Sequence, residues 1–146
     1  MPASAGNLDE IRQLTEKECR LTPQRGAILQ ALLEMEDRHP TAEEVYQVAR
    51  RNWPSLGLAT VYRALDMFAG LGVLYRLDAG DGRIRYEIND GPHQHLICLG
   101  CGRIFEIREP LELEGLLKSK YSDFEVTYSS IRFFGYCQDC RLKKQR

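Results

Sequence analysis

The stretch "VLYRLDAGDGRIRYEI", residues 73–88, decides the fold, because the spacing of the apolar residues changes at its start. Before it, apolar side chains recur every three or four positions, as on one face of a helix. Within it they alternate with polar ones, as in strands, and Asp81-Gly82 is typical of a tight turn. The stretch therefore predicts a β-hairpin. Its shared faces are Val73, Tyr75 and Leu77 in the first strand and Ile84, Tyr86 and Ile88 in the second.

Two helices with recognisable caps are predicted upstream. Thr22 can cap a helix that starts at Pro23, because proline is already set to a helical φ and lacks only a donor that has no partner there. Thr41 and Glu44 have the spacing of a capping box, and Pro54 ends the helix that they open. The side chains expected to face the core from the first of these helices are Ile28, Leu29, Leu32 and Leu33.

A third helix is predicted over "LATVYRALDMFAGLG", residues 58–72, where a glycine ends it. A short additional helix is expected over 7–19 at the start of the chain. Three helices followed by a hairpin is the order of a winged helix-turn-helix, which places one helix in the major groove of DNA. The inward residues of the third helix are expected to be Val61, Ala64, Leu65 and Phe68.

The second half is predicted to be a small α/β unit. "NDGPHQ", residues 89–94, has the composition of a linker and divides the chain into expected domains 1–88 and 89–146. After it we expect a strand, a turn and a strand over 95–109, a helix opened by Pro110, and a further strand stretch over 123–137. The predicted fold class is α+β.

Four of the five cysteines form two C-x2-C pairs, and the remaining one, Cys19, is interpreted as a small buried residue. Two thiolates three residues apart on a turn can reach one ion, and two such pairs supply the closed tetrahedral set of structural zinc. Two disulfides, buried free thiols or a redox pair are the alternatives. The predicted zinc ligands are Cys98, Cys101, Cys137 and Cys140.

Two histidines, His93 and His95, lie just before the first cysteine pair. On a strand their side chains point to one face and that of Cys98 to the other, which indicates two separate sites. Glu106 on the paired strand could complete the second site. Imidazoles with carboxylates suit Fe(II), Mn(II), Co(II) or Zn(II). Glu87 and His39 are further candidates, and solvated or hydrogen-bonded side chains are the plain alternative for all of them.

Composition favours a soluble cytoplasmic protein and gives no support to DNA binding. The formal net charge is −1, and residues 1–88 carry 11 Lys and Arg against 13 Asp and Glu. Any contact with phosphates must come from a local patch. No apolar run approaches the ~20 residues of a membrane span, and no signal peptide is apparent.

Five segments in this order resemble the ferric uptake regulator family of bacterial metal-dependent repressors, over about residues 21–140. They are "RHPTAEEVY", "ATVYRALDMF", "GDGRIRYEI", "HQHLICLGCGRIFEI" and "YCQDC". The resemblance implies an N-terminal winged helix, a C-terminal α/β dimerisation domain, and a homodimer on palindromic operator DNA. It also implies a regulatory metal site formed by His39, Glu87, His93, His95 and Glu106, besides the structural zinc.

The resemblance places Tyr62 and Arg63 among the residues that touch operator DNA. An arginine can bridge guanine O6 and N7, so Arg63 is the candidate for reading a base. Thr60, Tyr62 and the hairpin arginines Arg83 and Arg85 are expected to contact the backbone, although a solvated hairpin face would explain both arginines equally well.

The resemblance also bears on the sensed metal. Peroxide-sensing relatives tend to have Asp where Glu106 stands and Asn where Arg63 stands, so we expect an iron sensor, with zinc or peroxide sensing as alternatives. The expected ion at the regulatory site is Fe(II), with Zn(II) or Mn(II) as alternatives.

Two alternatives belong to other classes of protein. A zinc hydrolase would need an open coordination position and a nearby base, and no catalytic spacing such as H-E-x-x-H is present. A hydrolase would also leave the winged-helix half unexplained. A zinc-ribbon module for protein binding is the second alternative, and failure of a dimer to bind any DNA palindrome would favour it. We therefore expect a metal-responsive transcriptional repressor rather than an enzyme, with no membrane partner.

Overall fold

The computed structural model describes residues 21–35, 39–89, 93–109, 111–126 and 129–144, so the predicted helix over 7–19 and Cys19 lie outside it. The chain divides into two compact units, Met1–Asp90 (unit 1) and Gly91–Arg146 (unit 2), and each is described by itself. Within the described residues, no helix has the length and apolar character to cross a membrane.

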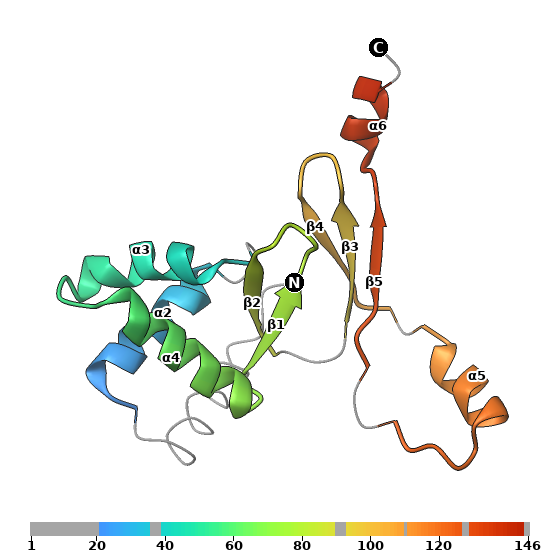
Figure 1. The fold of residues 1–146 in the computed structure, drawn as a ribbon, viewed down its shortest axis with the longest axis horizontal. Coiled ribbons are helices and arrows are strands. Elements are labelled where there is room, and N and C mark those ends of the chain that lie inside the picture. The colour runs from blue at the N-terminus through green and yellow to red at the C-terminus, as the bar shows by residue number, and fades with distance from the viewer. Residues whose placement is uncertain (1–20, 36–38, 90–92, 110, 127–128, 145–146) are drawn as a thin grey trace. The chain divides into compact units, whose positions relative to one another are not determined.

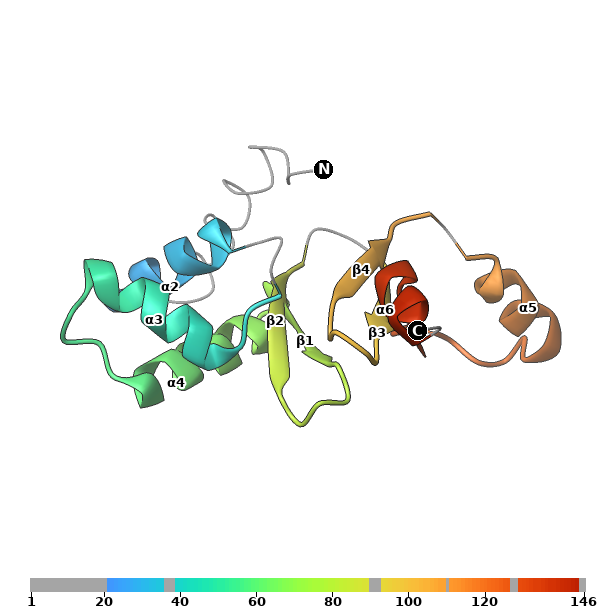
Figure 2. The same cartoon turned by 90° about the horizontal axis from the view of Figure 1, so that it is seen from above.

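In the part of unit 1 that the structure describes, three helices lie beside a β-hairpin, as the sequence predicts (Figures 1 and 2). The elements are α2 (Pro23–Glu34), α3 (Ala42–Asn52), α4 (Leu58–Gly70), β1 (Leu74–Asp78) and β2 (Ile84–Ile88). The helices bury most of the predicted faces, including all four inward residues of α4 and three of the four in α2, where Leu33 is only half-buried. This is the arrangement of a winged helix, in which α3 and α4 form the helix-turn-helix.

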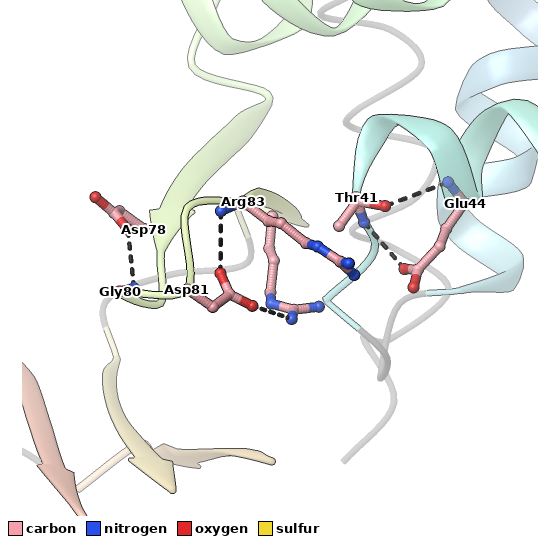
Figure 3. A network of polar contacts seen from close by, with 7 residues as sticks. Thr41, Glu44, Asp78, Gly80, Asp81 and Arg83 are labelled. Carbon is pink, nitrogen blue, oxygen red and sulfur yellow. Dashed lines mark hydrogen bonds and ion pairs between the residues drawn. The ribbon is translucent and has the colours of Figure 1, made fainter. Parts of the chain in front are cut away.

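Both predicted helix caps are confirmed. The Thr22 hydroxyl accepts a hydrogen bond from the Arg25 N–H at 3.3 Å, with Pro23 at the first helical position. At α3 the Thr41 hydroxyl accepts from the Glu44 N–H at 3.3 Å, and the Glu44 carboxylate accepts from the Thr41 N–H at 3.0 Å (Figure 3). These bonds satisfy N–H groups that have no partner inside the helix.

The C-terminal end of α4 is fastened to the hairpin. Gly72 has a φ of +75°, its N–H donates to Ala69 O at 3.1 Å, and the Val73 N–H donates to Phe68 O at 2.9 Å. This pair of bonds is a Schellman motif, in which the left-handed residue is usually glycine. The Asn89 side chain also donates to Gly72 O at 2.9 Å. Helix and hairpin are therefore joined directly, without a flexible connection.

The hairpin connection differs from the predicted two-residue turn. β1 and β2 are antiparallel with Asp78 opposite Ile84, so five residues, 79–83, connect them. Asp78 accepts from the Gly80 N–H at 2.9 Å and Asp81 from the Arg83 N–H at 3.1 Å, which replaces the single bond of a tight turn by two local ones (Figure 3). Ile84, at the loop end of its strand, is exposed rather than buried with Tyr86 and Ile88.

The described residues of unit 2 form a three-stranded sheet and two short helices, which makes the fold class α+β as predicted. The central strand β3 (Gln94–Cys98) pairs antiparallel with β4 (Ile104–Ile107) and parallel with β5 (Arg132–Gly135). α5 (Leu113–Lys120) lies beyond the β5 edge of the sheet, and α6 (Gln138–Lys144) follows β5 (Figures 1 and 2).

Two expectations for unit 2 are corrected. Among the described residues of the stretch 123–137, only Arg132–Gly135 forms a strand. The helix α6 is missing from the sequence prediction because seven residues carry too little periodicity. The predicted helix after Pro110 begins at Leu113.

Unit 2 leaves most of its apolar side chains in solvent. Of those that the structure describes there, only Ile97 and Cys98 are buried. A monomeric soluble protein rarely exposes large apolar patches. The exposed apolar side chains of unit 2 are Leu96, Leu99, Phe105, Leu113, Leu116, Leu117, Tyr121, Phe124, Val126, Phe133, Phe134, Tyr136 and Leu142.

Candidate metal centres and nucleic-acid interface

Strand pairing brings the two cysteine pairs to one end of the unit 2 sheet. Cys98 is the last residue of β3, and a turn carries the chain back through Cys101. In the parallel register Cys98 lies opposite Gly135 of β5, so Cys137 emerges beside it and α6 presents Cys140. The Cys137 N–H donates to Cys98 Sγ at 3.3 Å, which ties one pair to the other.

The four sulfur atoms have the spacing of a tetrahedral metal centre. All four Sγ atoms lie within 4.8 Å of one another, and those of Cys101 and Cys137 are 3.8 Å apart. A zinc ion with Zn–S bonds of about 2.3 Å separates its sulfurs by about 3.8 Å. All four thiols are free, and a disulfide bond is only about 2.05 Å long, so the disulfide alternative does not fit.

The charge of the cluster also favours a cation. Backbone N–H groups, first that of Cys137 and then that of Cys101, lower the pKa of Cys98 to about 6. The neighbouring sulfurs, Cys98 first, raise the pKa of Cys140 to about 12. Without a metal, therefore, the four thiols cannot all ionise at neutral pH, and a bound dication would offset their mutual repulsion.

One glycine and one ion pair complete the cysteine cluster. A Cβ atom on Gly100 would lie 2.7 Å from Cys140 Sγ, so only glycine fits there. Arg103 donates to Asp139 at 2.8 Å and joins the turn after β3 to α6. Asp139 first, and then Cys101, raise the pKa of the Arg103 guanidinium, which keeps a positive charge beside the thiolates.

In unit 1, His39 and Glu87 form a half-site. Thr41 makes an antiparallel bridge with Arg85, and two residues further along this register His39 comes opposite Glu87. The distance from His39 Nε2 to Glu87 Oε2 is 3.2 Å. Two such ligands of one zinc-like ion are separated by about 3.0–3.4 Å, so the pair fits a metal. His39 has a φ of +48°, a conformation unusual for a residue other than glycine and often found at functional sites.

In unit 2, His93, His95 and Glu106 gather on the face of β3 opposite Cys98. The His93 and His95 rings lie edge to face, 4.7 Å between centroids, so both histidines share a side as predicted. His95 is the direct cross-strand partner of Glu106. The distance from His93 Nε2 to Glu106 Oε1 is 3.8 Å, and Arg108 donates to the other oxygen of this carboxylate at 2.7 Å.

The outer face of α4 carries the residues predicted to meet DNA. Tyr62 and Arg63 are exposed and Thr60 is half-buried. The Tyr62 hydroxyl donates to Glu43 of α3 at 2.5 Å, and Arg63 donates to Thr60 at 3.3 Å. The face is therefore prearranged by hydrogen bonds, and it includes one carboxylate.

The two hairpin arginines differ in their surroundings. Arg83 is exposed at the loop, where its charge contributes to the lowered pKa of Glu43, after the larger effect of the Tyr62 hydrogen bond. Arg85 is mostly buried, and its guanidinium donates to Asp81 of the same hairpin at 2.8 Å. Of the two, Arg83 is the one that the structure leaves available at the surface for a phosphate.

Comparison with known proteins agrees with this geometry. The model of the "Ferric uptake regulator family" matches residues 16–134, most of the chain. The chain belongs to the ferric uptake regulator family. Proteins of this family are transcriptional regulators rather than enzymes, which agrees with the prediction of a metal-responsive, DNA-binding repressor.

Similar proteins include a peroxide-responsive repressor and two ferric uptake regulators whose structures were solved with different metals. The peroxide-responsive repressor PerR of Staphylococcus aureus is 36% identical over 137 residues, covering 92% of this chain and 91% of that protein. The Francisella tularensis ferric uptake regulator with iron is 31% identical, with a TM-score of 0.72 over 85% of this chain and 96% of that one. The Pseudomonas aeruginosa regulator with manganese is 29% identical, with a TM-score of 0.71 over 89% and 96%.

The sequence analysis did not predict several polar contacts in and around the candidate sites. The Arg108–Glu106 pair has a signal, since residues two apart on a strand share a face. The Tyr62–Glu43 and Arg103–Asp139 contacts join segments far apart in the chain, and no spacing rule predicts them.

Proposed function

We propose that this regulator is an iron-responsive repressor whose regulatory cation takes ligands from both units. The observation that carries the proposal is that each unit holds a half-site of the same construction, a histidine opposite a glutamate across an antiparallel pairing. His39 and Glu87 form one half-site, and His93, His95 and Glu106 the other. Neither offers the four to six ligands that Fe(II), Mn(II) or Zn(II) takes, but together they do.

The switch follows from differential affinity. The cation supplies the positive charge that lets two carboxylates and three imidazoles share one centre. An arrangement of the units that joins the half-sites binds it more tightly than one that separates them, and only such a difference shifts an equilibrium. A coupling of about 3 kcal/mol would change operator affinity ~150-fold.

We infer that the cysteine cluster holds structural zinc. The sulfur spacing and the ionisation of the thiols support this assignment. With only two buried apolar side chains among its described residues, unit 2 has little core of its own, and a metal commonly supplements so small a core.

We also propose that unit 2 pairs with a second copy of the chain. Its exposed apolar residues include the whole predicted face of α5, Leu113, Leu116, Leu117 and Tyr121, and a hollow of about 470 Å³ is lined by α5 and the segment that includes Phe124. A homodimer would bury this surface and present two copies of α4 to successive major grooves, ~34 Å apart on a palindrome. Sedimentation of the zinc-loaded chain tests this, and a monomer at micromolar concentration would refute it.

The test of the switch is DNA binding by protein that holds zinc only at its cysteines. A palindromic site is first selected from random duplexes with metal-loaded protein, and binding is then titrated separately with Fe(II), Mn(II) and Zn(II). We expect Fe(II) to induce DNA binding at a free concentration within its physiological range, and Mn(II) and Zn(II) to require free concentrations above theirs. Equal DNA affinity with and without added metal, or an unchanged metal response of the His93→Ala/His95→Ala variant, would overturn the proposal.

Peroxide sensing is the second candidate, favoured by the 36% identity to PerR. Peroxide-sensing relatives tend to have aspartate where Glu106 stands, so glutamate at this position favours sensing of iron itself. Iron-loaded protein exposed to micromolar peroxide should keep its DNA affinity if it senses iron, and should lose it if it senses peroxide.

A further inference from the structure

We propose that Arg108 is an internal cation that competes with the regulatory metal for Glu106 and so raises the metal concentration at which the protein responds. This inference rests on the proposed regulatory site. Arg108 lies one residue beyond β4 and shares a face with Glu106, two positions earlier. Its guanidinium donates to Glu106 Oε2 at 2.7 Å.

The pairing holds the carboxylate away from its histidine. Glu106 Oε1 is 3.8 Å from His93 Nε2, whereas two ligands of one ion are about 3.0–3.4 Å apart. To join the imidazoles around a cation, Glu106 Oε1 must move closer to His93, while Arg108 holds the other oxygen, Oε2. Arg108 opposes this movement twice, through its hydrogen bond to Oε2 and through the repulsion that its charge exerts on the incoming cation.

The half-site in unit 1 provides an internal comparison. Arg85 also lies two residues from its glutamate, Glu87, on the same strand. Its guanidinium donates instead to Asp81 at 2.8 Å, and His39 Nε2 is 3.2 Å from Glu87 Oε2, within ligand spacing. The two half-sites thus share a plan of histidine, glutamate and arginine. In unit 1, Arg85 is paired with Asp81, which is not a candidate ligand. In unit 2, Arg108 is paired with the candidate ligand Glu106 itself.

The size of the effect is limited because both partners are partly exposed, with 41% of Arg108 and 26% of Glu106 accessible. Solvent-screened charge pairs of this kind contribute little each, so we expect about a three- to tenfold change in metal affinity, smaller at high salt.

The experiment uses the full-length protein with zinc at its cysteines and Co(II) as the probe, followed by the visible absorbance of cobalt bound to the second site. Arg108→Gln should bind cobalt about three- to tenfold more tightly than the parent at low salt, with a smaller gain in 0.5 M salt. Arg108→Lys keeps the charge and should remain close to the parent. Lys120→Gln, which removes a positive charge from α5, is the matched control and should not differ from the parent.

The reciprocal variant is Asp81→Asn, which releases Arg85 toward Glu87 and should weaken cobalt binding. Zinc content and far-UV circular dichroism confirm that each variant is folded. An Arg108→Gln affinity equal to that of the parent, or an equal gain in Lys120→Gln, would overturn the role of Arg108 while leaving the regulatory site intact. A parent protein that binds no cobalt beyond its cysteines would overturn the regulatory site and the competition together.

Discussion

The Tyr62 hydroxyl, on the helix expected to enter DNA, donates a hydrogen bond to the Glu43 carboxylate of α3 at 2.5 Å. The bond lowers the pKa of Glu43 and raises that of Tyr62, so at neutral pH the pair is a carboxylate and a neutral phenol. A negative charge thus stands on a surface proposed to meet phosphates. We therefore expect that Glu43 orients Tyr62 but weakens the electrostatic attraction between this surface and DNA phosphates.

Replacing Glu43 separates these two effects. Glu43→Gln keeps an acceptor for the Tyr62 hydroxyl and removes the charge, so operator affinity should rise severalfold at low salt and less at high salt. Glu43→Ala removes both and should bind less tightly than Glu43→Gln. Fluorescence anisotropy at two salt concentrations measures both, and equal affinities of the Gln and Ala variants would show that orientation of Tyr62 is unimportant.

Gly100→Ala should weaken zinc binding, because the new Cβ would lie 2.7 Å from Cys140 Sγ. Overpacking of this kind costs roughly 1–3 kcal/mol, or about five- to 150-fold in affinity. Gly115→Ala is the matched control, since a Cβ there meets nothing within 4 Å and alanine should stabilise α5 by about 0.5–1 kcal/mol. Competition with a zinc chelator compares the variants, and parental zinc retention by Gly100→Ala would contradict the described geometry.

Cys137→Ser should release zinc and unfold unit 2 while leaving unit 1 folded. The lost thiol lies 3.8 Å from that of Cys101, so the proposed zinc centre loses one of its four sulfurs, although the backbone N–H of residue 137 can still donate to Cys98 Sγ. Unit 1 has its own buried core, which includes Phe68, Leu65 and Val61, and should keep its helices. Hydrogen exchange resolved by segment measures this, and the expectation fails if the amides of β3 and β5 stay protected.

His39→Asn should abolish regulatory metal binding with little loss of stability. His39 has a φ of +48°, a conformation that asparagine tolerates and β-branched residues do not. His39→Val should lose both metal binding and stability, by about 1–3 kcal/mol for the strained backbone. Thermal unfolding and cobalt titration distinguish the two, and a similar loss of stability in both variants would mean that the imidazole itself supports the fold.

The sequence predicted best where local rules act. The caps at Thr22 and Thr41 and the buried face of α4 follow from spacing alone, and all are present. The hairpin loop was predicted too short, because Asp78 and Asp81 make side-chain bonds that a dipeptide rule does not include. β5 was predicted too long, since an alternating pattern does not show where pairing with β3 stops.

The candidate cysteine ligands were equally accessible to sequence, because a repeated C-x2-C carries its own geometry. His39 and Glu87 were weak candidates from the residues alone, and only the family resemblance assigned them to the regulatory site. They are 48 positions apart in the chain and meet through the pairing of the 40–41 segment with β2, which no periodicity encodes. The sequence analysis did not predict the contact between Arg108 and Glu106, although residues two positions apart on a strand share a face.

Because α4 is hydrogen-bonded directly to the hairpin, we expect the two to move together as one rigid body. Glu87 stands on a strand with the exposed loop of Arg83 at one end and, just past the other, Asn89, which is clamped to Gly72 at the close of α4. A displacement of Glu87 by a bound cation would therefore move the hairpin loop and α4 together. Mutations that loosen this clamp should blunt the response to metal even where every ligand and every DNA-facing side chain is untouched.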